Sequence, residues 1–203
     1  KLILTYLSKN GEEGYAGNLN VRLVYELTND NALKISYSAT TNETTPINLT
    51  HHSFFNLKGA ENGNIAGHFL QIEANFYLPI DEESIPTGEI INVKNSVFDF
   101  RKAKKIGKHI NEKEQQIIFG NGYDHTFVLN GKGLRSVAKV SEPIFGRTME
   151  VITDEIGMQF YSGNFLNGKD IGKNNKAYHF RNAFCLETQH FPNSPNQDNF
   201  PPT

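Results

Sequence analysis

The sequence predicts an all-β protein of the sandwich or barrel type, and two observations lead to this expectation. Short stretches in which apolar and polar residues alternate recur along most of the 203 residues, and a period of two is typical of strands with one buried face. Clusters of Gly, Asn, Asp and Pro separate these stretches, as turns do in sandwiches and barrels. Because no internal repeat or low-complexity linker interrupts the pattern, we expect one domain over residues 1–203.

The first expected strands lie near the start of the sequence. The run "LILTYL" is strand-like from residue 2 onward. In "VRLVYEL" (21–27) apolar residues occupy every second position, and after "TNDNA" the alternation returns in "LKISYSAT" (33–40). These two runs predict a hairpin with one buried face.

The later strands are expected to repeat this pattern, and one stretch departs from it. The expected strands lie in "HFLQIEANFYLPI", "GEIINV", "HTFVLN", "RSVAKVSE", "RTMEVITD", "GMQFYSGNFL" and "AFCLETQ". The one expected helix is "RKAKKIGKHINEKEQQI" (101–117). We interpret its "RKAKK" segment as a solvated helix face rather than a phosphate-binding patch.

Composition and charge exclude several classes of partner. Lys and Arg number 20 against 22 Asp and Glu, a formal net charge of -2, so neither nucleic acid nor an anionic membrane is expected to bind. No run of about 18 apolar residues is present, and we expect no membrane span. The single cysteine, Cys185, excludes an intrachain disulfide and a cysteine-based zinc site, and we expect it to serve packing. A lone thiol is compatible with a reducing compartment, and we expect a cytoplasmic location.

Two adjacent histidines, His51 and His52, lie in the strand-like segment "NLTHHSFFNL" (48–57). Successive side chains of a strand point to opposite faces, so only one of the two is expected to address a given site. Neighbours on a strand cannot chelate one ion from one face, and no HExxH motif is present, so we expect no metal site. On these residues alone, one histidine bonded to backbone and the other exposed is a sufficient interpretation.

Three further segments carry residues suited to chemistry. "GYDHTFVLN" (122–130) places Asp124 at the start of a strand, and "GMQFYSGNFL" (157–166) places Gln159 and Tyr161 on one strand face. "CLETQHFPNSPN" (185–196) places Glu187 among β-forming residues. Taken singly, a turn-capping aspartate, an exposed glutamine and a surface glutamate explain them equally well.

Taken together and in this order, "NLTHHSFFNL", "GYDHTF", "QFYSGNF" and "LETQHFPNSPN" resemble the motifs of the galactose mutarotase (aldose 1-epimerase) family. The segment "YLSKNGEEGYAGNLNVRLVYELT" also resembles that family, so the similarity covers almost the whole chain. The resemblance implies a large antiparallel β-sandwich with a sugar cleft. It also implies interconversion of the α and β anomers of an aldose, such as galactose or glucose, without a cofactor.

The resemblance also assigns roles to individual residues. It implies that His52 and Glu187 are catalytic, and that Asp124, Gln159 and Tyr161 bind substrate. His51 stands where the family commonly has Asn, and Phe54 stands where Tyr is common. The Asn-Arg pair and the His-Gly-Gly segment with a further active-site histidine do not occur in this sequence, so we expect a fragment of the family's cleft and further residues on both sides of the chain.

The reaction itself requires these residue types. Anomer exchange needs removal of the C1 hydroxyl proton and protonation of the ring oxygen, followed by rotation about C1–C2 and ring closure. Glu187 as base and His52 as acid supply these steps, and an imidazole with a pKa near 6.5 gives and retakes a proton near neutral pH. We expect Asp124 to accept hydrogen bonds from sugar hydroxyls, and nearby aromatic rings to cover the apolar sugar face.

Two other functions remain open from the sequence. One is a carbohydrate-binding sandwich without catalysis. The other is a glycosidase that uses Asp124 and Glu187 as paired carboxylates, although the neighbouring histidine argues against it. In all three cases the expected partner is a neutral sugar, and the sequence indicates no oligomeric state.

Overall fold

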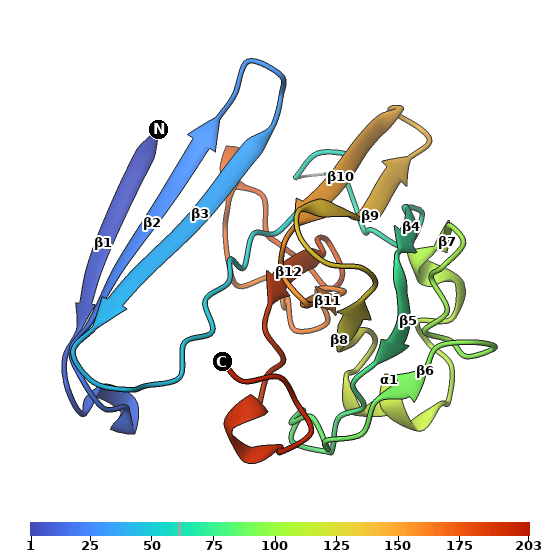
Figure 1. The fold of residues 1–203 in the computed structure, drawn as a ribbon. Coiled ribbons are helices and arrows are strands. Elements are labelled where there is room, and N and C mark those ends of the chain that lie inside the picture. Colours follow the sequence, from blue (N-terminus) through green and yellow to red (C-terminus); the bar gives the residue numbers. More distant parts are fainter. Residues whose placement is uncertain (61) are drawn as a thin grey trace. The chain divides into compact units, whose positions relative to one another are not determined.

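The computed structural model describes residues 1–60 and 62–203, and the chain divides into two compact units (Figure 1). The first unit contains Lys1–Leu49 together with Thr203, and the second contains Thr50–Pro202. All pairings between the strands are antiparallel among the described residues. The predicted all-β class is therefore confirmed, and the single domain stays a prediction.

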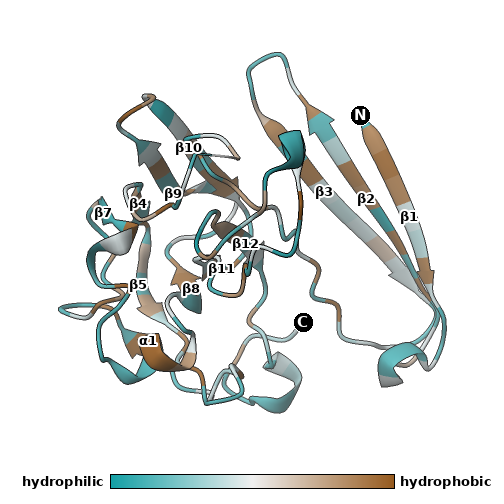
Figure 2. Ribbon diagram, turned by 180° about the vertical axis from the view of Figure 1, so that it is seen from behind, coloured by the Kyte–Doolittle hydropathy of each residue, from teal (hydrophilic) through white to brown (hydrophobic). Residues whose placement is uncertain are grey.

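The first unit is a three-stranded sheet. Its strands are β1 (Leu2–Ser8), β2 (Leu19–Leu27) and β3 (Leu33–Thr41), in the order β1-β2-β3. β2 and β3 form the predicted hairpin, with Leu27 opposite Leu33. Hydrophobic and hydrophilic bands alternate along β2 (Figure 2). The strand residues are half-buried or exposed, so the predicted buried face is only partly covered.

The second unit contains a five-stranded sheet that carries the predicted site. Its strands lie in the order β12-β11-β8-β5-β6. β12 is thus an edge strand of this sheet, next to β11 and then β8. Their bounds are Ala74–Tyr77 for β5, Ile91–Asn92 for β6, Asp124–Leu129 for β8, Gly157–Tyr161 for β11 and Cys185–Gln189 for β12.

A four-stranded sheet is the second layer of this unit. It has the order β10-β9-β4-β7, with β4 at Phe69–Ile72, β7 at Lys104–Lys105, β9 at Arg135–Glu142 and β10 at Arg147–Thr153. β9 and β10 form a hairpin whose register shifts between Val151 and Ile152, where a bulge increases the local twist.

The two sheets of the second unit share one hydrophobic core. From the five-stranded sheet it takes Phe127, Met158, Phe160 and Leu186, and from the four-stranded sheet Leu70, Ile72, Val137 and Val140. Each such side chain contributes about 1.5–3 kcal/mol when fully buried. Because this core occupies one face of β8, β11 and β12, their alternate residues are directed to the opposite face.

The predicted helix over residues 101–117 is wrong. Only its last three residues belong to the short helix α1 (Gln115–Phe119), where the Glu114 side chain accepts a hydrogen bond from the Ile117 N–H. Lys104 pairs with Leu70 in the sheet. Polar composition suggested a helix, but the backbone hydrogen bonds of this segment go to a neighbouring strand and the turn before it.

The "RKAKK" segment is also not a uniformly solvated face. Lys104 Nζ donates to the Val97 carbonyl at 2.6 Å and lies 4.0 Å from the centre of the Phe100 ring. Burial lowers the Lys104 pKa to about 8. A lysine packed in this way serves the fold, and no phosphate-binding role is needed to explain it.

The remaining helical turns are short. In the described part of the chain they are four 3₁₀ turns: η1 (Glu12–Gly14), η2 (Ile106–Lys108), η3 (Lys173–Asn175) and η4 (Ser194–Asn196). Among the described residues, no helix has the length and apolar character that crossing a membrane requires.

Candidate active site

Polar side chains gather on the face of β8, β11 and β12 opposite the core. The register places Gln159 between Glu187 and Thr126, and Tyr161 between Cys185 and Asp124. Residues directly opposite each other in neighbouring antiparallel strands project from the same face. Three strands from distant parts of the sequence therefore present one continuous set of side chains: Asp124, Thr126, Gln159, Tyr161, Cys185 and Glu187.

His52 joins this set from a segment that borders β12. The Thr50 hydroxyl donates to the Thr188 carbonyl at 2.9 Å, and Phe55 and Phe184 exchange two backbone hydrogen bonds of 2.8 and 3.0 Å. His52 lies between these two attachments. The segment forms no regular strand, only an isolated bridge at Phe55, so the expectation that the two histidines lie within a strand is wrong.

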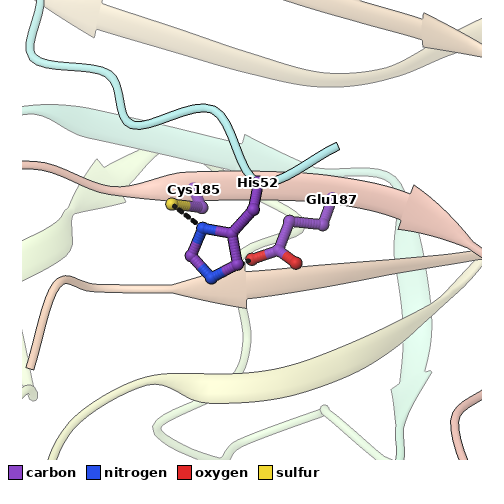
Figure 3. Close-up of side chains that lie close together, drawn as sticks. All are labelled: His52, Cys185 and Glu187. Carbon is purple, nitrogen blue, oxygen red and sulfur yellow. Dashed lines mark hydrogen bonds and ion pairs between the residues drawn. The ribbon is translucent and has the colours of Figure 1, made fainter. Parts of the chain in front are cut away.

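The His52 ring lies between Glu187 and Cys185 (Figure 3). Its Nε2 is 3.6 Å from Glu187 Oε1, and its Nδ1 is 3.4 Å from Cys185 Sγ. The His52 side chain is 55% exposed and that of Glu187 only 9%. The imidazole therefore forms the accessible side of the pair, with the carboxylate beneath it.

Electrostatics favour a proton on His52 Nε2 when the ring is neutral. Burial raises the pKa of the Cys185 thiol, and the carboxylates of Glu187 and Asp124 raise it further. A protonated thiol donates to Nδ1, which leaves the ring proton on Nε2. That nitrogen is the one that faces Glu187.

Glu187 has the electrostatic properties of a general base that works near neutral pH. Burial raises its pKa to about 7, His52 opposes this rise, and the Asp124 carboxylate adds to it. A carboxylate at this pKa is ionised in a large fraction of molecules at pH 7, and it binds a proton more strongly than an exposed glutamate. The environment thus makes Glu187 a stronger base.

Asp124 and Gln159 form an ordered pair beside Glu187. Gln159 Nε2 donates to Asp124 Oδ1 at 2.7 Å, and the Thr126 hydroxyl donates to Gln159 Oε1 at 2.6 Å. These two bonds fix the orientation of the glutamine amide. Burial raises the Asp124 pKa, and the hydrogen bond from Gln159 opposes that rise. One Asp124 oxygen is thus engaged by the protein, and the carboxylate can accept further bonds.

The turn before β8 is built to place Asp124. Gly122 has φ of 134°, and a Cβ atom there would lie 2.5 Å from Asn164 Oδ1. The Asn164 amide donates to the carbonyls of Gly120 and Tyr123 at 2.9 and 3.0 Å. Glycine is therefore required where the chain enters the strand.

Aromatic rings surround the polar cluster. The His52 ring centre lies 4.9 Å from that of Phe54 and 5.8 Å from that of Tyr161. Phe165 stacks on Tyr161 at 6.2 Å with an interplanar angle of 14°. The Tyr161 hydroxyl accepts a hydrogen bond from the Phe165 N–H at 2.8 Å. Phe54 and Phe165 are exposed, so apolar ring surface borders the polar groups.

The structure brings all five predicted site residues together, and it adds two. Thr126, which orients Gln159, has no local sequence signal. Cys185, expected to serve packing, is buried but also contacts His52. Its position two residues before Glu187 in a strand places both on one face, so the sequence indicated that Cys185 faces the site but not that it contacts His52.

A half-exposed histidine, a buried glutamate and an amide-anchored aspartate thus lie together on one face of an antiparallel sheet. The family model described as aldose 1-epimerase matches residues 1–203. The chain belongs to the aldose 1-epimerase family.

Two members of this family are similar in sequence to this chain over most of its length. Over 197 residues the chain is 46% identical to the galactose mutarotase of Bos taurus, covering 97% of this chain and 56% of the bovine one. The aldose 1-epimerase of Haemophilus influenzae is 38% identical over 190 residues, 93% of this chain and 55% of its own. The chain thus spans about half the length of these relatives.

A solved structure shows the same fold. The crystal structure of galactose 1-epimerase from Lactobacillus acidophilus NCFM matches with a TM-score of 0.84 at 33% identity, over 96% of this chain and 55% of that one. The sandwich fold that the sequence resemblance implied is therefore confirmed.

Proposed function

We propose that the protein is an aldose 1-epimerase that interconverts the α and β anomers of an aldohexose by opening and closing the sugar ring. The single observation that carries this proposal is the His52–Glu187 pair, with Nε2 and Oε1 3.6 Å apart. The C1 hydroxyl and the ring oxygen are bonded to the same carbon. A base for one and an acid for the other must therefore be neighbours, as these two groups are.

The proton transfers follow from this geometry. Glu187 takes the proton of the C1 hydroxyl while protonated His52 gives a proton to the ring oxygen, so the bond between C1 and the ring oxygen breaks and an aldehyde forms. Rotation about C1–C2 presents the other face of the carbonyl. Glu187 then returns its proton to the carbonyl oxygen, His52 retakes the proton of the attacking hydroxyl, and the ring closes. Each group ends as it began.

The surrounding residues supply binding. Asp124 accepts hydrogen bonds from sugar hydroxyls with its charged carboxylate, and Gln159 holds that carboxylate in place. The rings of Phe54 and Tyr161 offer apolar surface to the C–H face of the sugar. The names of the relatives support galactose as a substrate, and glucose is the second candidate.

The state of the cysteine bears on the compartment in which the protein works. Cys185 is the one cysteine of the sequence, and it is buried with a free thiol. A free thiol persists in a reducing compartment. This supports the cytoplasm as the place of action.

Polarimetry tests the proposed activity. Freshly dissolved α-galactose or α-glucose changes its rotation slowly in buffer, and the protein in its full natural length should accelerate that change in proportion to its concentration. Binding of the sugar without acceleration would select the carbohydrate-binding alternative. Release of a reducing sugar from an aryl glycoside would select the glycosidase, in which Asp124 and Glu187 act as the carboxylate pair.

Replacing Asp124 with asparagine should weaken sugar binding and lower turnover, together reducing kcat/KM about tenfold or more. If the asparagine oxygen keeps the bond to Gln159, its amide nitrogen faces the sugar, and an acceptor becomes a donor. Steady-state polarimetry gives kcat and KM, and Asp154→Asn, an exposed residue outside the site, controls for the loss of charge. An unchanged KM would remove Asp124 from the binding site.

Replacing His51 with asparagine should leave turnover within a few-fold. The His51 Nδ1 accepts a hydrogen bond from the Ser53 N–H at 3.4 Å, and among the described residues no hydrogen bond or ion pair joins His51 to Glu187 or Asp124. Burial lowers the His51 pKa, and His52 lowers it further, so His51 is expected to be neutral. Polarimetry of His51→Asn beside the unsubstituted protein measures the effect. A loss of 100-fold would make His51 part of the reaction.

A further inference from the structure

Three donor atoms of different elements converge at the candidate site. His52 offers an imidazole nitrogen, Cys185 a sulfur and Glu187 a carboxylate oxygen, and these atoms all lie within 4.8 Å of one another (Figure 3). Cys185 and Glu187 are buried in β12, so their positions are set by the sheet. The reaction proposed above makes no use of the sulfur.

The spacing approaches that of a tetrahedral zinc site. Zinc binds sulfur at about 2.3 Å and nitrogen or oxygen at about 2.0–2.2 Å, so its ligand atoms lie roughly 3.3–3.7 Å apart. The His52 ring is already 3.4 Å from the sulfur through Nδ1 and 3.6 Å from the oxygen through Nε2. For one ion to bind all three groups, a single ring nitrogen of His52 must face both the sulfur and the oxygen. The His52 side chain is 55% exposed, which leaves room for the ring to turn.

The charges of the site favour a cation. The Asp124 carboxylate raises the pKa of Glu187, and among the described residues His52 is the one side chain within ion-pair distance of the Glu187 carboxylate. A divalent ion bound by the Glu187 carboxylate and the Cys185 thiolate would balance the negative charges of these two ligands. The thiol proton would be released to solvent. A neutral sugar offers no such compensation.

We propose that His52, Cys185 and Glu187 form an inhibitory binding site for one borderline-soft divalent ion of the Zn²⁺ class. Nitrogen, sulfur and carboxylate ligands suit this class, and the fourth position is open to water. The ion occupies both groups of the acid–base pair and therefore stops the reaction. Inhibition rests on the proposed function, but ion binding does not.

This site is neither a pair of neighbouring histidines nor a zinc site built on several cysteines, the two kinds of metal site that the sequence disfavours. The structure supplies the ligands from two segments more than 130 residues apart, and one thiolate suffices when a nitrogen and an oxygen complete the set. The reaction itself still needs no metal ion.

Titration with Co²⁺ tests binding without any activity assay. The probe should bind in a 1:1 ratio and produce a thiolate-to-cobalt charge-transfer absorption, and Zn²⁺ should displace it. Binding without that absorption would overturn the proposal, because the Cys185 thiolate would then not be a ligand. Isothermal titration calorimetry with Zn²⁺ gives the affinity.

Variants identify the ligands. Cys185→Ser and His52→Gln should each weaken Zn²⁺ binding at least about tenfold, the lower end of what second-sphere changes cost at metal sites. His109→Gln removes another histidine that pairs with a carboxylate, Glu112, and should leave the affinity unchanged. Cys185 is buried, so a melting curve checks folding of its variant, and the half-exposed His52 provides the second test. Equal Zn²⁺ affinity in all variants would overturn the proposal.

Activity separates this proposal from the proposed function. If the protein is an epimerase, Zn²⁺ should inhibit it, and in Cys185→Ser the half-inhibiting concentration should rise at least about tenfold, each protein being normalised to its own metal-free rate. Unchanged inhibition in Cys185→Ser would overturn the metal site and leave the epimerase intact. Cobalt binding through the thiolate without anomer exchange would support the metal site and overturn the epimerase.

Discussion

Replacing Glu187 with glutamine is expected to lower turnover at least about 100-fold with little change in sugar affinity. Glutamine keeps the shape of the side chain and one hydrogen-bond acceptor, but it cannot take the C1 hydroxyl proton. Polarimetric kcat and a direct binding titration measure the two effects separately. Glu112→Gln is a matched control, because Glu112 also pairs with a histidine, His109, outside the site.

The pH dependence gives the same prediction a second readout. Burial raises the Glu187 pKa to about 7, and the reaction uses the deprotonated form. As pH falls through that value the base is protonated, so kcat/KM should fall about tenfold per pH unit on the acid side. Residual activity in Glu187→Gln should lack this acid limb. Full activity in the variant would exclude Glu187 as the base.

Replacing His52 with asparagine is expected to have an effect of similar size, at least about 100-fold on turnover. Asparagine retains a donor group but cannot deliver a proton to the ring oxygen. The side chain is 55% exposed, so its replacement should change the melting temperature little. Stopped-flow or conventional polarimetry measures the rate, with His51→Asn as the neighbouring control.

The comparison of the two histidines is decisive for the assignment. If His51→Asn abolished activity while His52→Asn was tolerated, the acid would be His51. The contacts argue against that outcome, because the 3.6 Å approach to Glu187 is made by His52 and His51 bonds to its own turn.

Period-two patterns predicted the sheet residues of the site well. The alternation in "GMQFYSGNFL" and "CLETQ" reflects Phe160 and Leu186 packing in the core while Gln159 and Glu187 occupy the other face. Such patterns arise because one face is buried and the other is polar. The side-by-side placement of β8, β11 and β12, in contrast, depends on pairing between distant segments, which local patterns do not contain.

Local sequence patterns could not predict two features of the structure. The segment 101–117 has helical composition, yet Lys104 pairs in a sheet and Ile106 is buried, so tertiary packing overrode local preference. His52 is held by hydrogen bonds of Thr50 and Phe55 to the β12 region rather than by strand pleating. The position of its ring relative to Glu187 therefore required the folded structure.

The most direct test of the central claim is exchange spectroscopy on the anomeric protons of galactose at equilibrium. The account predicts exchange cross-peaks between the α and β anomers that appear with the protein, grow with its concentration and vanish when Glu187→Gln replaces it. Sugar signals that broaden through binding while no exchange develops would contradict the account, as would exchange that survives unchanged in Glu187→Gln.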